Sequence, residues 1–237
     1  KKRDTTLTQS AFPIDINLST MNGTTTTAIY KVATAPFDYI EITSTTFRIP
    51  ATTISTPNDT TLFRVNSLED LIDELDELFT LTGIITSNNT LNTEIIGIGT
   101  IEDNDLPPSI KMDDSEQQEG VDLVHTIEIS HPSSRPIEIA IRTRDETAIS
   151  PDDYSAISET ITIDGTVDPS NANIQKLFNI PTIIDNLNEL DRESLKVEGT
   201  VTSSNVSTQD LRKIGTIIDI DPDPLIAVNN VTVVEGT

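Results

Sequence analysis

The heptapeptide GTIEDND at residues 99–105 returns at residues 215–221 as GTIIDID, with five of the seven positions identical. The second copy begins 116 residues after the first, a separation that matches the length of one ordinary domain. Because the residues between the two copies differ freely, the match indicates an internal repeat rather than a biased composition. The fold is therefore one that the chain forms more than once.

A second pair of segments has the same separation. Residues 109–120 correspond to residues 225–236, and both segments end in Glu-Gly. Two further matches recur at a separation of 115 residues: Asp38-Tyr39 with Asp153-Tyr154, and Asp70, Glu74 and Asp76 with Asp185, Glu189 and Asp191. Four matched segments in the same order support the repeat, with one residue inserted before its end.

The repeat divides the chain into three parts. We expect a first repeat at residues 1–106 that lacks its opening strand, a complete second repeat at residues 107–223, and the opening strand of a third repeat at residues 224–237. The joints at residues 105–108 and 221–224 are rich in proline, which fixes φ and disfavours helix in the residue before it. We therefore expect short, semi-rigid joints, repeats arranged end to end with little contact, and a longer parent protein.

Alternation of apolar and polar residues predicts strands throughout the second repeat. Isoleucine, valine and leucine interleave with threonine there, a mixture that suits half-buried, pleated strands. The predicted strands are residues 125–129, 137–141, 160–163, 195–201 and 214–218. About seven short strands separated by turn signals indicate an all-β fold, a β-sandwich.

One stretch has helical spacing instead. The apolar residues of segment 68–79 follow a period near 3.6, and Ser67 precedes them as a possible N-cap. The matching segment of the second repeat keeps this pattern only weakly. We therefore expect a single helical turn in a loop, followed by a strand over residues 78–86, in preference to a full helix.

The charge of the chain excludes two classes of partner. With 15 Lys and Arg against 39 Asp and Glu, the formal net charge is -24, so no nucleic acid and no anionic membrane surface is expected to bind. No apolar run is long enough for membrane insertion. There is no cysteine, which excludes disulfides and zinc–thiolate sites.

Signatures of catalysis are absent as well. The chain contains no nucleophile elbow, zinc-protease motif or phosphate-binding loop. Its two histidines, His125 and His131, are expected at the surface. A carboxylate pair that hydrolyses sugars needs an aromatic-lined cleft, and the chain has no Trp, three Tyr and six Phe. We expect no enzymatic activity.

Clustered carboxylates are the remaining chemistry. Calcium takes six to eight oxygen ligands and suits loops that carry several Asp and Glu. The segment DIDPD at residues 219–223 begins like an EF-hand loop, but the required glycine and the closing glutamate are missing. The alternative interpretation is that these residues stabilise turns and add solubilising charge.

The motifs together resemble a known family. An opening strand that ends in Glu-Gly, a central Asp-Tyr, the acidic segment IIDNLNELD at residues 183–191 and a closing Gly-Thr-Ile-x-Asp-x-Asp are similar to Calx-beta domains. The resemblance covers essentially the whole chain. It implies tandem immunoglobulin-like β-sandwiches of seven strands, with Ca2+ bound in the loops at one end. The Asp-Tyr motif is expected to form a corner, with Tyr39 and Tyr154 packed inward and their hydroxyls hydrogen-bonded.

The resemblance also names the expected calcium ligands. In the second repeat they are Glu119, Asp153, Asp185, Glu189, Asp219 and Asp221. In the first repeat they are Asp38, Asp70, Glu74, Asp103 and Asp105.

Tandem domains of this kind are similar to those of large bacterial adhesins of the biofilm or gliding type. The resemblance implies a calcium-stabilised module that acts as a stalk or filament spacer in cell adhesion. Its location would be extracellular, at the cell surface. Its partners would be neighbouring repeats, with a surface or substratum ligand bound by other parts of the protein. The alternatives are a calcium-sensing regulatory module like those of sodium–calcium exchangers, and an accessory module of a secreted enzyme.

Overall fold

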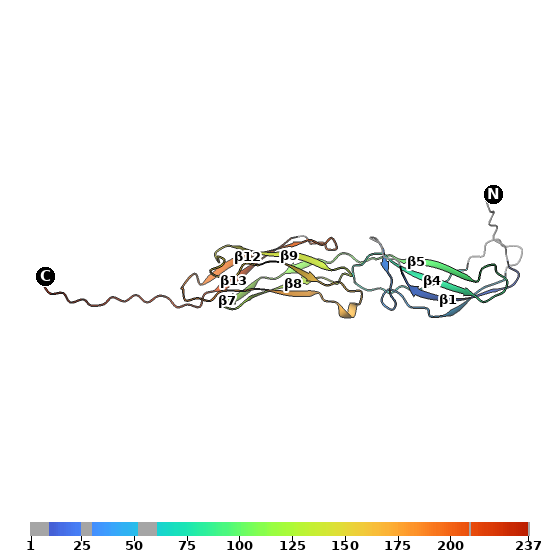
Figure 1. Ribbon diagram of the computed structural model, residues 1–237, viewed down its shortest axis with the longest axis horizontal. Coiled ribbons are helices and arrows are strands. Elements are labelled where there is room, and N and C mark those ends of the chain that lie inside the picture. Colours follow the sequence, from blue (N-terminus) through green and yellow to red (C-terminus); the bar gives the residue numbers. More distant parts are fainter. Residues whose placement is uncertain (1–9, 25–29, 52–60, 209, 237) are drawn as a thin grey trace, which may run out of the picture. The chain divides into compact units, whose positions relative to one another are not determined.

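The computed structural model describes residues 10–24, 30–51, 61–208 and 210–236, and these are almost entirely strands and loops (Figure 1). The described residues contain one helix, a three-residue 3-10 turn at Pro169–Asn171. No helix among them is long and apolar enough to cross a membrane. The chain forms two compact units. The first unit contains residues 1–106, 132–135 and 166–172, and the second contains residues 107–131, 136–165 and 173–237.

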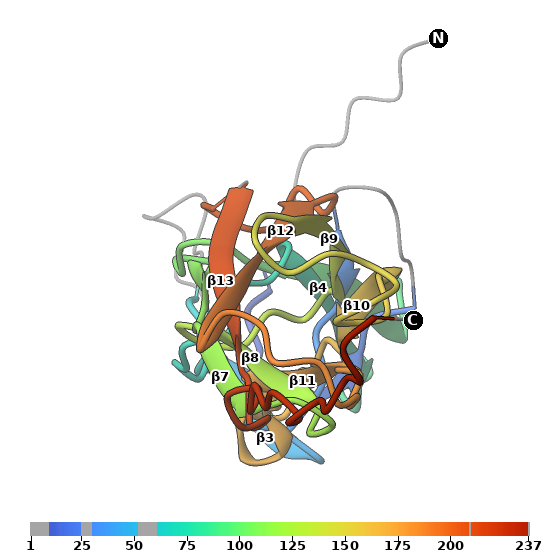
Figure 2. The ribbon, with the colours of Figure 1, turned by 90° about the vertical axis from the view of Figure 1, so that its left-hand side faces the viewer.

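The second unit consists of two sheets. One has the strand order β10-β9-β12-β13-β7 and the other β11-β8-β6. Figure 2 shows β9, β12 and β13 on one side of the unit and β8 and β11 on the other. The strands are β6 (Ile110–Met112), β7 (Ser115–Gln118), β8 (Leu123–Ile129), β9 (Ile137–Asp145), β10 (Ser158–Ile163), β11 (Gln175–Ile180), β12 (Arg192–Val201) and β13 (Asp210–Ile218).

Strict alternation of side chains builds the core between these sheets. Along β9, Ile137, Ile139 and Ile141 are buried while the residues between them are exposed, because successive strand residues point to opposite faces. The fold class is therefore the all-β one expected. The opening segment is divided into β6, which pairs with β8, and β7, which pairs parallel to β13. Because the opening segment forms two strands, the second unit has eight labelled strands, β6 to β13, where seven were expected.

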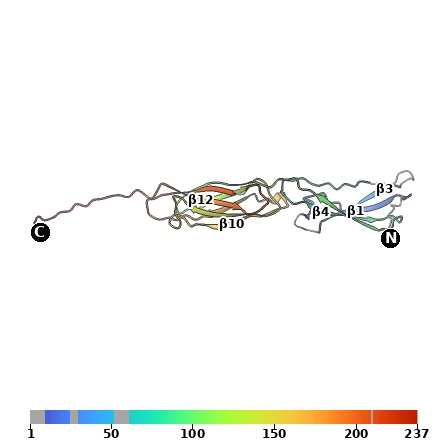
Figure 3. The same cartoon turned by 90° about the horizontal axis from the view of Figure 1, so that it is seen from above.

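The first unit has one five-stranded sheet in its described residues. Its order is β2-β4-β1-β3, and β5 also pairs with β4. In Figure 3, β1, β3 and β4 run side by side. The strands are β1 (Ile14–Asn22), β2 (Lys31–Val32), β3 (Thr45–Ile49), β4 (Glu77–Ile85) and β5 (Glu94–Ile101). A small cluster of Ala33, Tyr39 and Phe79 is buried against this sheet.

The helical turn expected in segment 68–79 is wrong. Backbone N–H groups there donate elsewhere: Leu68 to the carbonyl of Asp38 at 2.9 Å, and Ile72 to Oδ1 of Asp70 at 2.8 Å. In a helix that begins at Leu68, the N–H of Ile72 would donate to the carbonyl of Leu68 instead. The strand expected after the turn is present as β4.

The surface position expected for His125 is also wrong. His125 is 0 % exposed because it occupies an inward-facing position of β8, between Leu123 and Ile127. Its ring stacks on Phe178 with centroids 5.4 Å apart, and Nδ1 lies 2.9 Å from the carbonyl oxygen of Asp113. Burial lowers the pKa of His125. His131 is half-buried.

Candidate metal centre

The sheet register brings several chain segments to one end of the second unit. The start of β12 pairs with the end of β13, at Arg192 and Ile218, and the end of β7 pairs with Ile218 as well. Acidic residues follow β7 and β13 directly, and others lie just before β12 and in the loop after β9. The carboxylates expected as ligands from four separate segments therefore share one end of the sandwich.

Two groups of three carboxylates form there. Within each group, one ligand atom from every residue lies within 4.8 Å of the others. The groups are Glu119, Asp219 and Asp221, and Asp153, Glu189 and Glu193. Asp219 joins the two, because its Oδ2 accepts the backbone N–H of Glu189 at 3.0 Å and its Oδ1 accepts that of Asp221 at 2.9 Å.

Burial and mutual repulsion raise the pKa values of several carboxylates in this cluster. Burial, and then the carboxylates of Asp153 and Glu189, raise the pKa of Glu193 to about 7. Burial and neighbouring carboxylates also raise the pKa values of Glu189 and Glu119. The backbone N–H bonds of Asp219 lower its own pKa, so this residue stays ionised. Such a group of charges favours protonation or a bound cation.

The first unit holds a corresponding acidic cavity of about 250 Å³. Its carboxylates come from the Asp-Tyr loop, the loop before β4, the start of β4 and the segment after β5. They are Asp38, Glu69, Asp70, Glu74, Glu77, Glu102, Asp103 and Asp105. Three of them, Asp38, Glu74 and Glu77, place ligand atoms within 4.8 Å of one another.

Two of these side chains are buried deeply. Asp38 is 5 % exposed and Glu77 is 4 % exposed. Oδ1 of Asp38, Oε1 of Glu74 and Oε2 of Glu77 have no hydrogen-bond partner among the described residues. Burial first, and then the Asp38 carboxylate, raises the pKa of Glu77 to about 9. Burial and the surrounding aspartates raise that of Glu74 to about 8.

The same hydrogen bonds orient the aspartates in both units. Oδ1 of Asp70 accepts the N–H of Ile72 at 2.8 Å, and Oδ1 of Asp185 accepts that of Leu187 at 2.7 Å. These are turn-forming bonds, which the alternative interpretation of the sequence requires. Each leaves the second carboxylate oxygen available, so turn formation and ion binding are compatible roles.

A second recurring bond joins the last strand to the acidic loop. Oδ2 of Asp103 accepts the backbone N–H of Glu74 at 3.1 Å, as Oδ2 of Asp219 does from Glu189 at 3.0 Å. All eleven residues predicted from the sequence thus lie in the two acidic clusters or directly against them. That they bind a metal ion stays a prediction.

Two members of the clusters were not predicted. Glu77 is the first residue of β4 and Glu193 is the second residue of β12, 116 residues apart, and each is buried. The signal was present in the repeat separation. However, neither glutamate belongs to a recognised motif, and Glu77 lies within the segment of helical spacing.

The donor chemistry fits calcium. Each cluster offers only oxygen ligands, and several are on loops, the arrangement that Ca2+ prefers. None of the three groups contains histidine, and the chain has no cysteine. Zinc and other metals that favour nitrogen or sulfur ligands are therefore poor matches. The buried, unpartnered oxygens of Asp38 and Glu77 are the atoms that a bound cation would contact.

Several solved structures are similar to this chain. The apo form of the Calx CBD1 domain is 17% identical, with a TM-score of 0.35, and the match covers 48% of this chain and 99% of that one. The CBD12 domains of CALX1.2 are 14% identical over 88% of this chain and 89% of that one, with a TM-score of 0.34. The calcium binding domain CBD12 of CALX1.1 is 17% identical over 82% and 71%, with a TM-score of 0.32.

No family model and no curated protein matches the sequence. At these identities and TM-scores, the similar structures say nothing about what this chain binds. The carboxylate geometry alone supports the function proposed below.

Proposed function

We propose that each unit binds calcium through the acidic cluster at the end of its sheet. The observation that carries the proposal is the pair Asp38 and Glu77, which are buried beside each other with unpartnered oxygens. No salt bridge to either carboxylate is present among the described residues. Burial of an unpaired charge is costly, and a divalent cation offsets that cost.

The residues that would hold the ion follow from the groups. In the first unit they are Asp38, Glu74 and Glu77, supported by Asp70, Asp103 and Asp105. In the second unit the two groups of three, with Asp185 beside them, would hold it. Calcium would supply positive charge there, and the protein's part is to join the Asp-Tyr loop, the acidic loop and the end of the last strand. The bound state would therefore be stiffer and more stable than the empty one.

We propose an extracellular setting, as a spacer module in a bacterial surface adhesin. Support comes from the presence of a cluster in both units with the same hydrogen bonds, since repeated stabilising sites suit a stalk. Neighbouring repeats of the same chain would be its direct partners, and other parts of the protein would bind the surface ligand. Extracellular modules bind calcium at about 10⁻⁴–10⁻³ M.

The alternative function is regulatory calcium sensing. The large number of carboxylates in each cluster favours it, because ligand charge raises calcium affinity. A sensor would bind at about 10⁻⁷–10⁻⁵ M and change conformation when it does. Affinity and conformational response therefore separate the two settings.

Isothermal titration calorimetry with CaCl₂ tests the proposal. Binding by the parent chain, and weaker binding by Glu77→Gln, is the expected result. Glu94→Gln provides a matched control, because Glu94 is an exposed glutamate on the neighbouring strand β5. Equal heats from all three proteins, or none from the parent, would contradict the proposal.

A further inference from the structure

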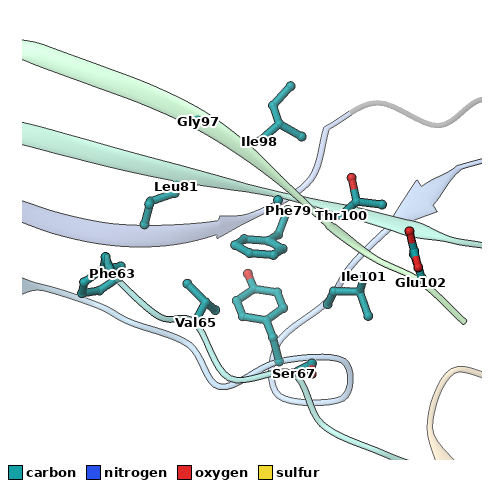
Figure 4. A pocket seen from close by; sticks show the side chains of 12 residues that line it. Phe63, Val65, Ser67, Phe79, Leu81, Gly97, Ile98, Thr100, Ile101 and Glu102 are labelled. Carbon is teal, nitrogen blue, oxygen red and sulfur yellow. The ribbon is translucent and has the colours of Figure 1, made fainter. Parts of the chain in front are cut away.

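The outward face of the sheet in the first unit carries large apolar side chains. Along β1, β4 and β5, alternate residues point away from the buried cluster of this unit. Figure 4 shows the two sides of the sheet, with Ile98 and Thr100 on one side and Phe79 and Ile101 on the other. The large apolar residues of the outward face are between 55 and 72 % exposed: Met21, Ile84, Ile96 and Ile98.

The strand register makes these side chains neighbours. Met21 on β1 and Ile98 on β5 both lie opposite Thr80 of β4, one on each side of it. Ile96 is the next outward residue of β5, and its diagonal neighbour on β4 is Ile84. Side chains at these spacings on one face are within reach of each other. Single apolar residues are normal on a surface, but a continuous apolar patch across three strands marks an interaction site.

The polar side chains of the same face bond to one another. The hydroxyls of Ser19 and Thr82 lie 2.9 Å apart, in a hydrogen bond between β1 and β4. The hydroxyl of Thr46 on β3 donates to Oδ1 of Asn17 at 3.0 Å. A polar group that has a partner within the sheet costs less to remove from water than an unpaired one. This face can therefore be covered at a lower cost than most polar surfaces.

The centre of this face carries no charge. Residues 17–21, 78–84 and 96–100 contain no Asp, Glu, Lys or Arg, although these types make up 23% of the chain. The second unit shows that the fold does not require an uncharged face. The repeat and the strand pairing identify the corresponding outward positions, and all three of its strands carry charged side chains there: Arg142, Arg144, Lys196, Glu198 and Arg212.

The face has the composition of an interface. Ile214, the counterpart of Ile98 in the second unit, is 44 % exposed with β7 in place beside its strand, so this position lies on the outside of the fold. Charged side chains begin at one end of the face, where Arg48 pairs with Asp15 at 3.5 Å and Glu94 starts β5. An apolar centre bordered by polar and charged residues is typical of protein interfaces.

We propose that the outward faces of the first unit in two copies of this chain pack against each other. The charges favour a second copy as the occupant. Each copy has a formal net charge of -24, and two such chains repel each other least where neither carries charged side chains. Because both copies use the same face, the association is two-fold and closes at the dimer. The two sheets would stack about 10 Å apart.

The size of the face sets the strength of this dimer. Four strands about 4.8 Å apart and roughly eight residues long span on the order of 500 Å². The pair of faces would bury on the order of 1,000 Å², the lower limit for a specific interface. We therefore expect a weak, reversible dimer.

Sedimentation velocity of the full chain at increasing concentration tests the association. The parent should pass from monomer to dimer and stop there, and added salt should strengthen the dimer by screening the net charge. Ile98→Arg should weaken it by roughly tenfold or more, because a positive charge from each copy would lose its water next to a like charge. Ile214→Arg is the matched control at the corresponding position of the second unit, and it should dimerise like the parent.

The control also separates this face from general electrostatics. Each substitution lowers the negative charge of the chain by the same amount, so a general effect would strengthen association in both variants alike. Ile96→Arg provides a second variant, because the second unit carries Arg212 at that position of its sheet. It should weaken the dimer as Ile98→Arg does. Far-UV circular dichroism checks that each variant is folded.

Cross-linking locates the interface. The chain has no cysteine, so Thr80→Cys places a single thiol at the centre of the face, and Lys196→Cys places one at the corresponding position of the second unit. A short bismaleimide should link Thr80→Cys into dimers and leave Lys196→Cys monomeric. A parent that stays monomeric up to about 200 μM, equal dimerisation of Ile98→Arg and the parent, or equal cross-linking of the two cysteine variants would each overturn the proposal.

Discussion

The hydroxyl of Tyr154 donates a 2.6 Å hydrogen bond to Oδ1 of Asp145, and the ring is 0 % exposed. In the first unit the hydroxyl of Tyr39 donates to Oδ1 of Asn22 at 2.9 Å. The prediction that these tyrosines pack inward with bonded hydroxyls is therefore confirmed. Each bond ties the Asp-Tyr loop to the end of a strand, β9 or β1, and so fixes the loop that presents Asp153 or Asp38.

Truncation of Tyr154 should show how much this corner contributes to the free energy of unfolding. Tyr154→Ala removes a fully buried aromatic side chain and should lower the free energy of unfolding by about 3 kcal/mol or more. Tyr154→Phe keeps the ring and should cost about 1 kcal/mol, the value of one hydrogen bond. Urea denaturation checks both. A loss below about 1 kcal/mol for Tyr154→Ala would contradict the corner.

Calcium should raise the stability of the parent chain. Binding to the folded state alone adds roughly 2.7 kcal/mol at a concentration about 100 times the dissociation constant. Magnesium should add much less, because it needs tight octahedral geometry and releases its water reluctantly. Thermal unfolding in CaCl₂, MgCl₂ and chelator measures the difference. Identical melting in calcium and in chelator would count against both sites.

The double variant Asp219→Asn with Asp221→Asn tests whether these two residues are calcium ligands or only form turns. Asparagine keeps the size and the turn-forming ability of aspartate but removes its charge. If the two residues bind calcium, the variant should lose most of the roughly 2.7 kcal/mol gained by the second unit. A variant that keeps the full calcium-dependent rise in melting temperature would show that they only form turns.

The calcium-free protein should become less stable as the pH rises. The pKa of Glu77 is raised from 4.5 to about 9 and that of Glu74 from 4.5 to about 8. Between the unfolded and folded pKa values, the folded state binds more protons than the unfolded state. The free energy of unfolding therefore falls from about pH 5 upward and levels off above pH 9.

Urea midpoints in chelator across this range check the direction of the effect. Calcium binding at neutral pH should release protons from the same carboxylates, which a pH-indicator dye in weak buffer detects. A calcium-free midpoint that rises with pH would show that Glu74 and Glu77 are ionised at no cost in the fold.

Much of the sandwich could be predicted because its strands alternate cleanly. β9 and β12 place apolar residues at every second position, so their register follows from the sequence. β11 was not predicted: Leu177 is exposed while its neighbour Phe178 is buried, and the adjacent apolar pair hides the period. The helical spacing of segment 68–79 misled for a different reason, since contacts with Asp38 and Asp103 override local periodicity.

The candidate site was predictable as far as its motifs extend. Asp219 and Asp221 stand in a repeated motif, and the loops that carry Asp153 and Glu189 recur as well. Glu193 also recurs, as Glu77 at the repeat separation, but its role depends on the place where β12 starts beside β13, which a linear pattern leaves open. The burial of Asp38 is likewise a property of packing, since it depends on the distant segment whose Leu68 N–H donates to the carbonyl of Asp38 at 2.9 Å.

Glu77→Gln and Glu193→Gln should have opposite effects with and without calcium. Without the ion, each glutamate is buried among other carboxylates, and burial and repulsion raise its pKa. Glutamine has a similar size and is neutral at every pH, so it avoids the cost of protonating or burying a carboxylate. The variants should therefore melt higher than the parent in chelator, by about 2–4 °C for each kcal/mol of relief. With calcium, the same substitution removes a ligand and should reduce the calcium-dependent gain. Glu94→Gln and Glu159→Gln, on exposed strand positions of the first and second units, should change neither value.

The inversion distinguishes ion binding from general charge relief, because charge relief alone predicts a higher melting temperature in both solutions. Variants that melt above the parent in calcium and in chelator alike would exclude Glu77 and Glu193 from the calcium sites.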